Sequence, residues 1–404
     1  MSQEASSLIV GVPRETFPGE RRVALVPATA ATLSKKGVEV VVEAGAGAEA
    51  GFPDAEYTER GARVLATRAE VFSQAQIIAQ VRAAGANPDA GQADCELLQA
   101  GQVLIAQCEP LAEAQSLDGF KQAEVSCFSL ELVPRITRAQ SMDVLSSMAT
   151  VAGYKAVLLA AETLPRMFPM MMTAAGTITP ARVFVVGAGV AGLQAIATAK
   201  RLGAVVRAYD IRPVVREQVE SVGGKFVELE LSAGDAEGKG GYAKAMDDEF
   251  YRKQREVMTE VVRESDVVIT TAAIPGKQAP ILVTGEMVKE MAPGSVLVDL
   301  AAERGGNCDL TKPGETIIEH GVSILGPINL PASVPYHASE MYSRNMSTFL
   351  LNMVKDGAWS PDFEDEIVKE TLVTHEGEIV HERVREALGL EPNTGNVVVD
   401  EPED

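Results

Sequence analysis

The pattern of hydrophobic positions along the chain alternates between short apolar runs and segments of helical periodicity. In the first third, the apolar runs predict strands and the segments between them predict helices. Strands separated by helices in this order are typical of a parallel sheet with crossover connections. The predicted strands are residues 8–12, 38–43, 75–81 and 103–106, and the predicted helices are residues 28–36 and 54–60.

The same alternation continues after a helical pattern that runs from residue 141 to about 163 and a Pro- and Met-rich stretch. Apolar residues at helical spacing in "MYSRNMSTFLLNMV" predict a late helix that crosses back to the first domain. Further strands are predicted at residues 265–271, 295–300 and 322–325. We therefore expect an α/β fold with two Rossmann-like doubly wound parallel-sheet domains flanking a cleft. The first comprises residues 1–140 completed by 336–404, and the second residues 141–335.

Residues 182–210, "RVFVVGAGVAGLQAIATAKRLGAVVRAYD", predict a strand, a tight turn, a helix and a second strand that ends in an acid. Gly187 permits the turn, Gly189 lets the backbone approach a pyrophosphate, and Gly192 allows close helix packing. Asp210 follows at the expected distance of about 20 residues, where a carboxylate holds the ribose 2′-hydroxyl. The alternative is that these glycines serve packing alone. The order of all these features favours a dinucleotide site.

Asp210 also bears on which dinucleotide is bound. A 2′-phosphate beside a carboxylate meets a repulsion of about 1 to 4 kcal/mol at ~4 Å, depending on the local dielectric. Arg212, two residues further on, softens this repulsion. We expect NAD(H) rather than NADP(H).

Composition excludes several classes of function. The 404 residues are 46% hydrophobic and 23% charged, as in an ordinary globular protein. The formal net charge of −21 repels nucleic acid, so we expect no such partner, although solubility alone also accounts for the acidity. The four cysteines show no C-x-x-C spacing and the four histidines lie in the last quarter, so we expect no metal site. With neither a secretion signal nor an apolar run of about 18 residues, we expect a cytoplasmic chain.

Two further segments carry polar groups in suggestive patterns. In "ELVPRITRAQSMDVLSS", Gln140, Asp143 and Ser146 are spaced by three at the start of a predicted helix. They either line a site, or Ser141 or Asp143 simply caps the helix. In "SAGDAEGKGGYAKAMDDEFYRKQ", glycines surround Tyr242. This loop is either a lid over a cofactor or a surface insertion.

The chain resembles the NAD(H)-binding component of proton-translocating nicotinamide nucleotide transhydrogenase, in a superfamily shared with alanine dehydrogenase. The resemblance runs nearly end to end through segments that include "VPRETFPGERRVALVP", "PRITRAQSMDVLSS", "FPMMMTAAGTITPARVFVVGAGVAGLQAIATAKRLGAVV", "TTAAIPGK" and "MAPGSVLVDLAAERGGNC". The "RAQSMD" segment and the glycine-tyrosine loop are specific to the transhydrogenase branch.

The resemblance implies roles for individual positions. Arg135, Gln140 and Asp143 correspond to residues around the nicotinamide, and we predict them as the catalytic set. Tyr242 lies in the loop that closes over the nucleotide. The predicted cofactor-binding set is Arg135, Ile136, Arg138, Gln140, Ser146, Gly187, Gly189, Val190, Gly192, Asp210, Ile211, Arg212, Gly241, Tyr242, Gln254 and Ala273.

The implied function is direct hydride transfer between NAD(H) bound here and NADP(H) held by a partner subunit. The implied assembly is a homodimer with a membrane-spanning subunit and an NADP(H)-binding subunit, peripherally associated with the inner membrane. Hydride transfer between two nicotinamides needs no proton transfer at the reacting carbons, so positioning of the rings and exclusion of water suffice.

Two alternatives stay open: an alanine dehydrogenase and a non-catalytic NAD(H)-binding module. The dehydrogenase needs a cation for the substrate carboxylate and proton donors for the carbonyl oxygen. Arg22 is retained, but Gln107 stands where the dehydrogenase has histidine. Arg82 lies near the position of its lysine and Glu303 near that of its catalytic aspartate. Transhydrogenase relatives also carry histidine at the position of Gln107, so the branch-specific segments decide.

Overall fold

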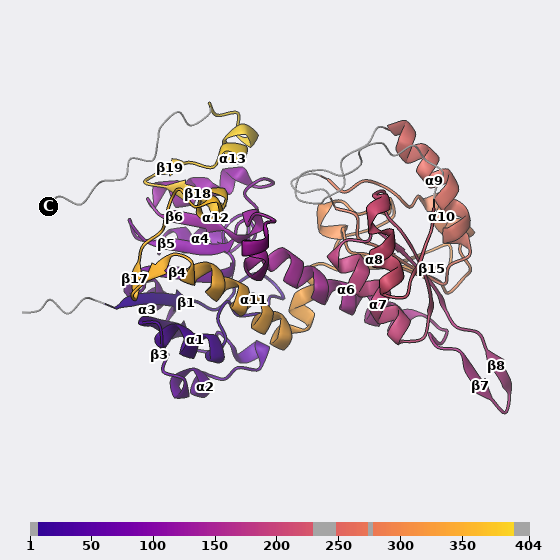
Figure 1. Ribbon diagram of the computed structural model, residues 1–404, viewed down its shortest axis with the longest axis horizontal. Coiled ribbons are helices and arrows are strands. Elements are labelled where there is room, and N and C mark those ends of the chain that lie inside the picture. The colour runs from indigo at the N-terminus through magenta and orange to yellow at the C-terminus, as the bar shows by residue number, and fades with distance from the viewer. Residues whose placement is uncertain (1–6, 229–247, 274–277, 392–404) are drawn as a thin grey trace, which may run out of the picture. The chain divides into compact units, whose positions relative to one another are not determined.

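Two compact units make up the chain in the computed structural model, which describes residues 7–228, 248–273 and 278–391 (Figure 1). The first unit comprises residues 1–148 and 332–404, and the second comprises residues 149–331. Each unit is built on one large sheet with helices, as the alternation of apolar runs predicts. The expected α/β class with two Rossmann-like sheets is confirmed, and the cleft between the domains stays a prediction.

The sheet of the first unit has the strand order β19-β18-β6-β5-β4-β1-β2-β3. The chain moves outward from β1 to β3 and then returns past β1 to β4, β5 and β6, all parallel. This is the doubly wound order, with its switch point between β1 and β4. The strands are β1 (Leu8–Val12), β2 (Val38–Glu43), β3 (Arg63–Leu65), β4 (Ile77–Arg82), β5 (Val103–Gln107), β6 (Ser126–Ser129), β18 (Leu372–His375) and β19 (Glu378–Ile379).

Late segments of the chain complete the first unit. Strand β18 pairs antiparallel with β6, and β19 pairs antiparallel with β18. Helix α11 (Pro335–Leu351) buries Tyr342, Met346 and Phe349, and the hydroxyl of Tyr342 donates to the Gln80 carbonyl at 3.0 Å. The remaining elements are α1 (Pro27–Ser34), α2 (Asp54–Glu59), α3 (Arg68–Gln74), α4 (Gly91–Cys95), α5 (Asp118–Gln122), β16 (Val354–Lys355), β17 (Ala358–Trp359), α12 (Glu366–Thr371) and α13 (Glu382–Ala387).

The sheet of the second unit has the order β11-β10-β9-β12-β13-β15-β14, again doubly wound, with only β14 antiparallel. Its central strands are buried along their length because both faces are covered. On β9, Val183 and Val185 face the cluster that holds Ile196, whereas Phe184 and Val186 face the cluster that holds Met258. The strands are β9 (Arg182–Val186), β10 (Val205–Tyr209), β11 (Lys225–Phe226), β12 (Val267–Thr270), β13 (Val296–Asp299), β14 (Thr316–Glu319) and β15 (Val322–Leu325), with helices α7 (Val190–Arg201), α8 (Arg216–Ser221), α9 (Asp248–Arg263) and α10 (Gly285–Glu290).

Helix α6 (Val144–Thr163) begins in the first unit and continues into the second. By length and composition alone it could cross a membrane, with a mean hydropathy of 1.5, and it is the one such helix among the described residues. A single helix of this kind is weak support for a span because core helices share these properties. Ala156, Val157 and Ala160 are fully buried in the core of the second unit.

The Pro- and Met-rich stretch forms a hairpin that sequence patterning did not predict. Strands β7 (Met171–Thr173) and β8 (Gly176–Ile178) pair antiparallel, and all six of their residues are exposed. Figure 1 shows the hairpin as an arm that extends from the sheet of the second unit. The side chains of Met170 and Met172 are 61% and 80% exposed.

Candidate functional site

The turn after β9 depends on two glycines. Gly187 has a φ of +98°, and its N–H donates to the Tyr209 carbonyl at 2.8 Å. A Cβ on Gly192 would lie 1.9 Å from the Gly187 carbonyl oxygen, so a side chain there would force the turn and α7 apart. Gly187 therefore supplies the conformation and Gly192 the close packing that the sequence analysis expects.

Gly189 differs from these two because the protein itself leaves room beside it. A Cβ on Gly189 would meet no described atom within 4 Å. Gly189 is the N-cap of α7, no described side chain caps this helix, and Val190 is 37% exposed. Such a helix start presents free N–H groups and the positive end of the helix dipole to an anion. The turn therefore fits a pyrophosphate, with space at Gly189 for its close approach.

Asp210 lies at the end of β10 and ties this turn to Arg212. Its Oδ2 accepts from the Ala188 N–H at 2.7 Å and from Nη2 of Arg212 at 2.9 Å. Its Oδ1 accepts from Nε and the backbone N–H of Arg212, both at 2.9 Å. Asp210 is only 8% exposed. The carboxylate thus fixes the glycine turn while its charge is balanced by the guanidinium.

Sequence reasoning missed a buried network beside this turn. The Asp299 carboxylate accepts from Thr270 Oγ1 and Thr311 Oγ1 and from three backbone N–H groups, including that of Asn307. Asn307 bonds both the N–H and the carbonyl of Ala272, and Thr271 donates to the Gly187 carbonyl at 3.1 Å. These residues fix the carboxyl ends of β12 and β13. The switch point of this sheet lies next to them, between β9 and β12, and doubly wound folds bind ligands at such a point. No spacing rule in the sequence singles them out.

Three weaker candidates of the second unit have different settings. Gln254 of α9 is 2% exposed, and its Nε2 donates to the Tyr209 hydroxyl at 2.7 Å, which fixes α9 against β10. Ala273 is exposed shortly after β12, and Ile211 lies between Asp210 and Arg212. Gly241 and Tyr242 lie outside the described residues.

The polar segment of the first unit forms a 3-10 helix, Thr137–Met142, before α6 begins at Val144. Asp143 caps α6, because its carboxylate accepts from the N–H and the hydroxyl of Ser146 at 2.8 and 2.6 Å. Ser141 is held to α11 by the Asn345 amide at 2.8 Å. The expected helix from residue 141 therefore starts three residues late. Asp143 and Ser146 come together, and the capping interpretation of Asp143 is confirmed.

The exposed residues of this segment differ in how they are held. Arg138 forms a bidentate ion pair with Asp365 at 2.7 and 2.6 Å. The hydrogen bond from Arg138, and that from the Ile367 N–H, lower the pKa of Asp365 to about 2 despite some desolvation. Arg135 and Gln140 are exposed, and Ile136 is half-buried. Gln140 thus exposes its side chain to solvent, whereas the guanidinium of Arg138 is paired with Asp365, the N-cap residue of α12.

The switch point of the first unit is filled by buried charges. Arg22 is 3% exposed and forms a bidentate pair with Glu20 at 2.7 and 2.6 Å. Burial opposes ionisation of Glu20, but Arg22 and Arg82 hold its pKa at about 2. Burial and the charge of Glu20 raise the pKa of Glu15 to about 8, and Glu15 accepts from the backbone N–H groups of Val81 and Arg82. Protein carboxylates therefore occupy the place where the second unit presents its glycine turn.

The positions that were compared with alanine dehydrogenase have the following surroundings in the structure. Arg22, the cation expected for a substrate carboxylate, is paired with Glu20. Gln107 ends β5 and is half-buried, and the Glu303 carboxylate of the second unit accepts from the Asn329 N–H. The described residues contain no group of three His, Cys, Asp or Glu side chains arranged to hold a metal ion.

Solved structures show the same fold. A transhydrogenase from Sinorhizobium meliloti superposes with a TM-score of 0.82 at 46% identity, covering 92% of this chain and all of that chain. An L-alanine dehydrogenase has a TM-score of 0.77 at 24% identity, covering 95% of this chain and 99% of that one, a likeness of fold alone.

Sequence comparisons cover both units. The family model described as alanine dehydrogenase/PNT, N-terminal domain matches residues 11–152, and that for the C-terminal domain matches residues 156–382. The chain is 46% identical to the first segment of NAD(P) transhydrogenase subunit alpha of Rhodospirillum rubrum, over 92% of this chain and 97% of the relative. It is 30% identical to alanine dehydrogenase of Halomonas elongata, over 95% and 97%. With both domain models matched and relatives aligned over nearly their full length, this chain belongs to the alanine dehydrogenase/PNT family.

Proposed function

We propose that the second unit binds NAD(H) and that the chain exchanges a hydride directly with NADP(H) held by a partner subunit. The observation that carries this proposal is the start of α7, which no described side chain caps, beside the space that the described atoms leave at Gly189. Its N–H groups suit the pyrophosphate, and Asp210 stands where the adenosine ribose is expected. The nicotinamide cofactor supplies the hydride chemistry.

The polar segment is proposed to position the nicotinamide. Gln140 and Arg135 are exposed, so both lie where a ligand can reach them. Asp143 is fixed by its bonds to Ser146, which makes it a rigid acceptor for the nicotinamide carboxamide. Hydride transfer requires the reacting carbons at roughly 3 to 3.5 Å, and rigid neighbours serve that alignment. We propose Tyr242 as part of a lid that excludes water.

The assembly proposed is a homodimer that acts with a membrane-spanning subunit and an NADP(H)-binding subunit in a proton-translocating complex. Relatives are named as subunit alpha or as a segment of it, names that imply further subunits. We place the chain on the cytoplasmic side, held at the inner membrane by those partners. The exposed methionines of the β7–β8 hairpin form an apolar surface suited to a second copy of the chain.

A self-contained alanine dehydrogenase is the second candidate, favoured by relatives of that name. It is disfavoured because Glu20 occupies Arg22, and because Gln107 cannot donate and accept protons as histidine does. A non-catalytic NAD(H)-binding module would use the same glycine turn without the polar segment.

The test combines the purified chain with a transhydrogenase NADP(H)-binding component and follows hydride transfer by stopped flow. We expect transfer between NADH and NADP⁺ only when both proteins are present. The chain alone, given pyruvate, ammonium and NADH, should show no turnover. Turnover with pyruvate would establish the dehydrogenase, and NADH binding without transfer to any partner would establish the binding module.

A further inference from the structure

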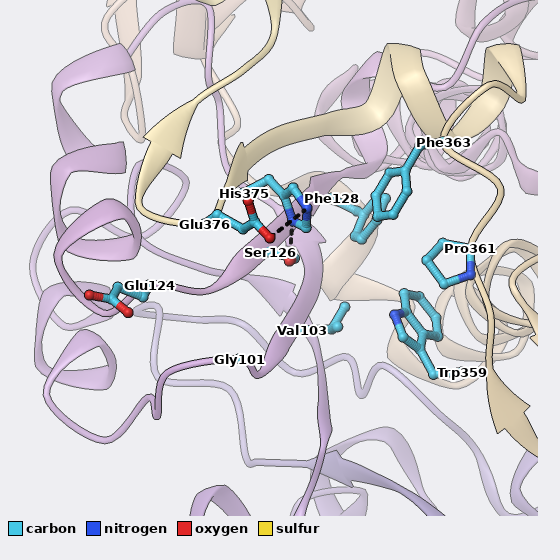
Figure 2. A pocket seen from close by; sticks show the side chains of 10 residues that line it. All are labelled: Gly101, Val103, Glu124, Ser126, Phe128, Trp359, Pro361, Phe363, His375 and Glu376. Carbon is cyan, nitrogen blue, oxygen red and sulfur yellow. Dashed lines mark hydrogen bonds and ion pairs between the residues drawn. The ribbon is translucent and has the colours of Figure 1, made fainter. Parts of the chain in front are cut away.

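A cavity of about 570 Å³ opens in the first unit, away from the switch point of its sheet. Val103 and Ser126, which line it, are the first residues of the parallel strands β5 and β6. Ligands of doubly wound sheets bind at the opposite, carboxyl ends of the strands. The cavity therefore belongs to neither the proposed NAD(H) site nor the charged cluster at Glu20. The full lining is Gly101, Val103, Glu124, Ser126, Phe128, Trp359, Pro361, Phe363, His375 and Glu376 (Figure 2).

Aromatic rings form the walls of this cavity. Trp359 and Phe128 meet nearly edge to face, with ring centroids 6.0 Å apart and planes at 76°. Phe363 lies 5.0 Å from the ring of His375. Phe128 is 1% exposed and also packs against Phe349, so this wall is rigid. Trp359 and Phe363 are only partly buried, so a ligand in the cavity can reach these two rings, and the electron-rich face of an aromatic ring attracts a cation.

The polar side chains of the cavity lining are two carboxylates, one hydroxyl and one imidazole. Glu124 and Glu376 are exposed, and Nε2 of His375 lies 4.0 Å from the Glu376 carboxylate. The Ser126 hydroxyl and Nδ1 of His375 are hydrogen-bonded at 2.8 Å, which fixes the imidazole. None of the ten lining residues is lysine or arginine. In a chain of net charge −21, this cavity disfavours anions.

We propose that the cavity binds a small organic cation whose ammonium group is methylated, such as a quaternary ammonium. Such a cation is weakly hydrated and gains from aromatic faces and nearby carboxylates without needing hydrogen-bond acceptors at its nitrogen. A metal ion would need converging ligands, but Figure 2 shows Glu124 and Glu376 on separate parts of the lining. A cavity of this volume suits a small molecule.

The chain contains one tryptophan, Trp359, so its fluorescence reports on this cavity. The experiment titrates the full chain with choline and, separately, with 3,3-dimethyl-1-butanol, the neutral molecule of the same shape. We expect a saturable change with choline and binding of the neutral molecule weaker by about fivefold or more. No saturable change with millimolar choline, or equal binding of both molecules, would overturn the proposal.

Two variants on one hairpin separate local contact from long-range charge. Glu376→Gln removes a lining carboxylate, whereas Glu378→Gln removes an exposed carboxylate on β19 outside the lining. Both substitutions change the net charge by the same amount, from −21 to −20, so a long-range charge effect would be equal in the two variants. We expect choline binding to weaken by about threefold or more in Glu376→Gln only, because only that carboxylate lines the cavity. Phe363→Leu should weaken it as well. Equal effects of the two glutamine variants would overturn the proposal, and saturation-transfer NMR of the choline methyl protons gives a second readout.

Discussion

The Arg212 guanidinium donates hydrogen bonds to both carboxylate oxygens of Asp210, which lies only two residues before it in the chain. The carboxylate that is proposed to meet the adenosine ribose is thus already neutralised in part, and it also holds the glycine turn through Ala188. Discrimination against a 2′-phosphate therefore depends on the pair rather than on a lone negative charge.

Asp210→Asn should narrow the preference for NADH over NADPH. The substitution removes the repulsive charge and releases a guanidinium that can pair with a 2′-phosphate. We expect the dissociation constant for NADPH divided by that for NADH to fall by about tenfold, or ~1.4 kcal/mol. Isothermal titration with both nucleotides measures this ratio. Arg212→Ala should move the ratio the other way, and a shift of both variants in the same direction would contradict the pairing argument.

Gly189→Ala and Gly192→Ala form a matched pair. The protein leaves room for a methyl group at Gly189 but not at Gly192, where the Gly187 carbonyl lies 1.9 Å from the Cβ position. Gly189→Ala should keep the melting temperature and weaken NADH binding by about tenfold or more, because the methyl group occupies space meant for the pyrophosphate. Gly192→Ala should lower both the melting temperature and the affinity for NADH. Unchanged NADH affinity in Gly189→Ala would show that the pyrophosphate does not bind at this turn.

Gln140→Asn tests the polar segment. The shorter side chain keeps its amide, and because Gln140 is exposed the fold should tolerate it. We expect hydride transfer in the reconstituted complex to slow by about tenfold or more, at least ~1.4 kcal/mol of transition-state stabilisation, with little change in NADH affinity. Stopped-flow transfer and equilibrium binding are measured on the same variant. An unaltered rate would exclude Gln140 from the catalytic set.

Glu15 should make the first unit less stable as the pH rises. Its pKa is raised from 4.5 to about 8, so the folded state retains a proton that the unfolded chain loses above pH 4.5. The contribution of Glu15 to the free energy of unfolding is fully present below pH 4.5. It is lost as the pH rises to about 8, a loss of at most about 5 kcal/mol. Glu131, with a pKa raised to about 7 by burial and the charge of Glu109, contributes with the same sign.

Denaturant unfolding between pH 5 and 9 measures this dependence. Glu15→Gln should flatten the fall in stability without removing it, because Glu131 still titrates. The slope, rather than the absolute stability, carries the test, since glutamine replaces one of the two acceptor oxygens that bond Val81 and Arg82. A slope equal to that of the wild type would show that Glu15 is ionised in the folded protein.

Met172→Asp in the β7–β8 hairpin should weaken the proposed homodimer. Met172 is 80% exposed, so the fold of the second unit does not depend on it, but an apolar contact with a second copy would. Light scattering after size exclusion should show a shift toward monomer. Val214→Asp, at a side chain 66% exposed outside the hairpin, is the control. Dimers of unchanged stability would place the interface elsewhere.

The apolar runs predicted most of the central strands, because buried parallel strands consist of little else, but they did not predict β6. The predicted strands at 8–12, 38–43 and 322–325 coincide with β1, β2 and β15. Strand β18 was missed because it is a run of four residues of which the last two are Thr374 and His375, and the β7–β8 hairpin because its residues are exposed and carry no alternation. Helix α6 starts late because Asp143 adopts an extended backbone and bonds Ser146 from outside the helix.

Within the candidate site, local geometry followed from sequence and remote geometry did not. The glycine turn and Asp210 belong to one strand–helix–strand unit, so their spacing defines them. Asp299, which ends β13, holds Asn307 of the following loop, and Asn307 holds Ala272 beside the residue that contacts the turn. The pairing of Arg138 with Asp365 joins segments far apart in the chain. Such contacts depend on how the elements pack, which hydrophobic periodicity does not encode.

The first unit is assembled from two stretches of chain, one that precedes the second unit in the sequence and one that follows it. During synthesis, residues 149–331 leave the ribosome as one continuous piece and can fold while the sheet of the first unit still lacks β18 and β19. Tyr342 and Phe349 are fully buried in the core of the first unit, and both are translated after the whole of the second unit. The N-terminal unit therefore cannot be completed first, although N-terminal domains generally fold first during synthesis. The unit that begins the polypeptide is the last to be completed, and a nascent chain arrested before α11 exposes its unfinished core to chaperones.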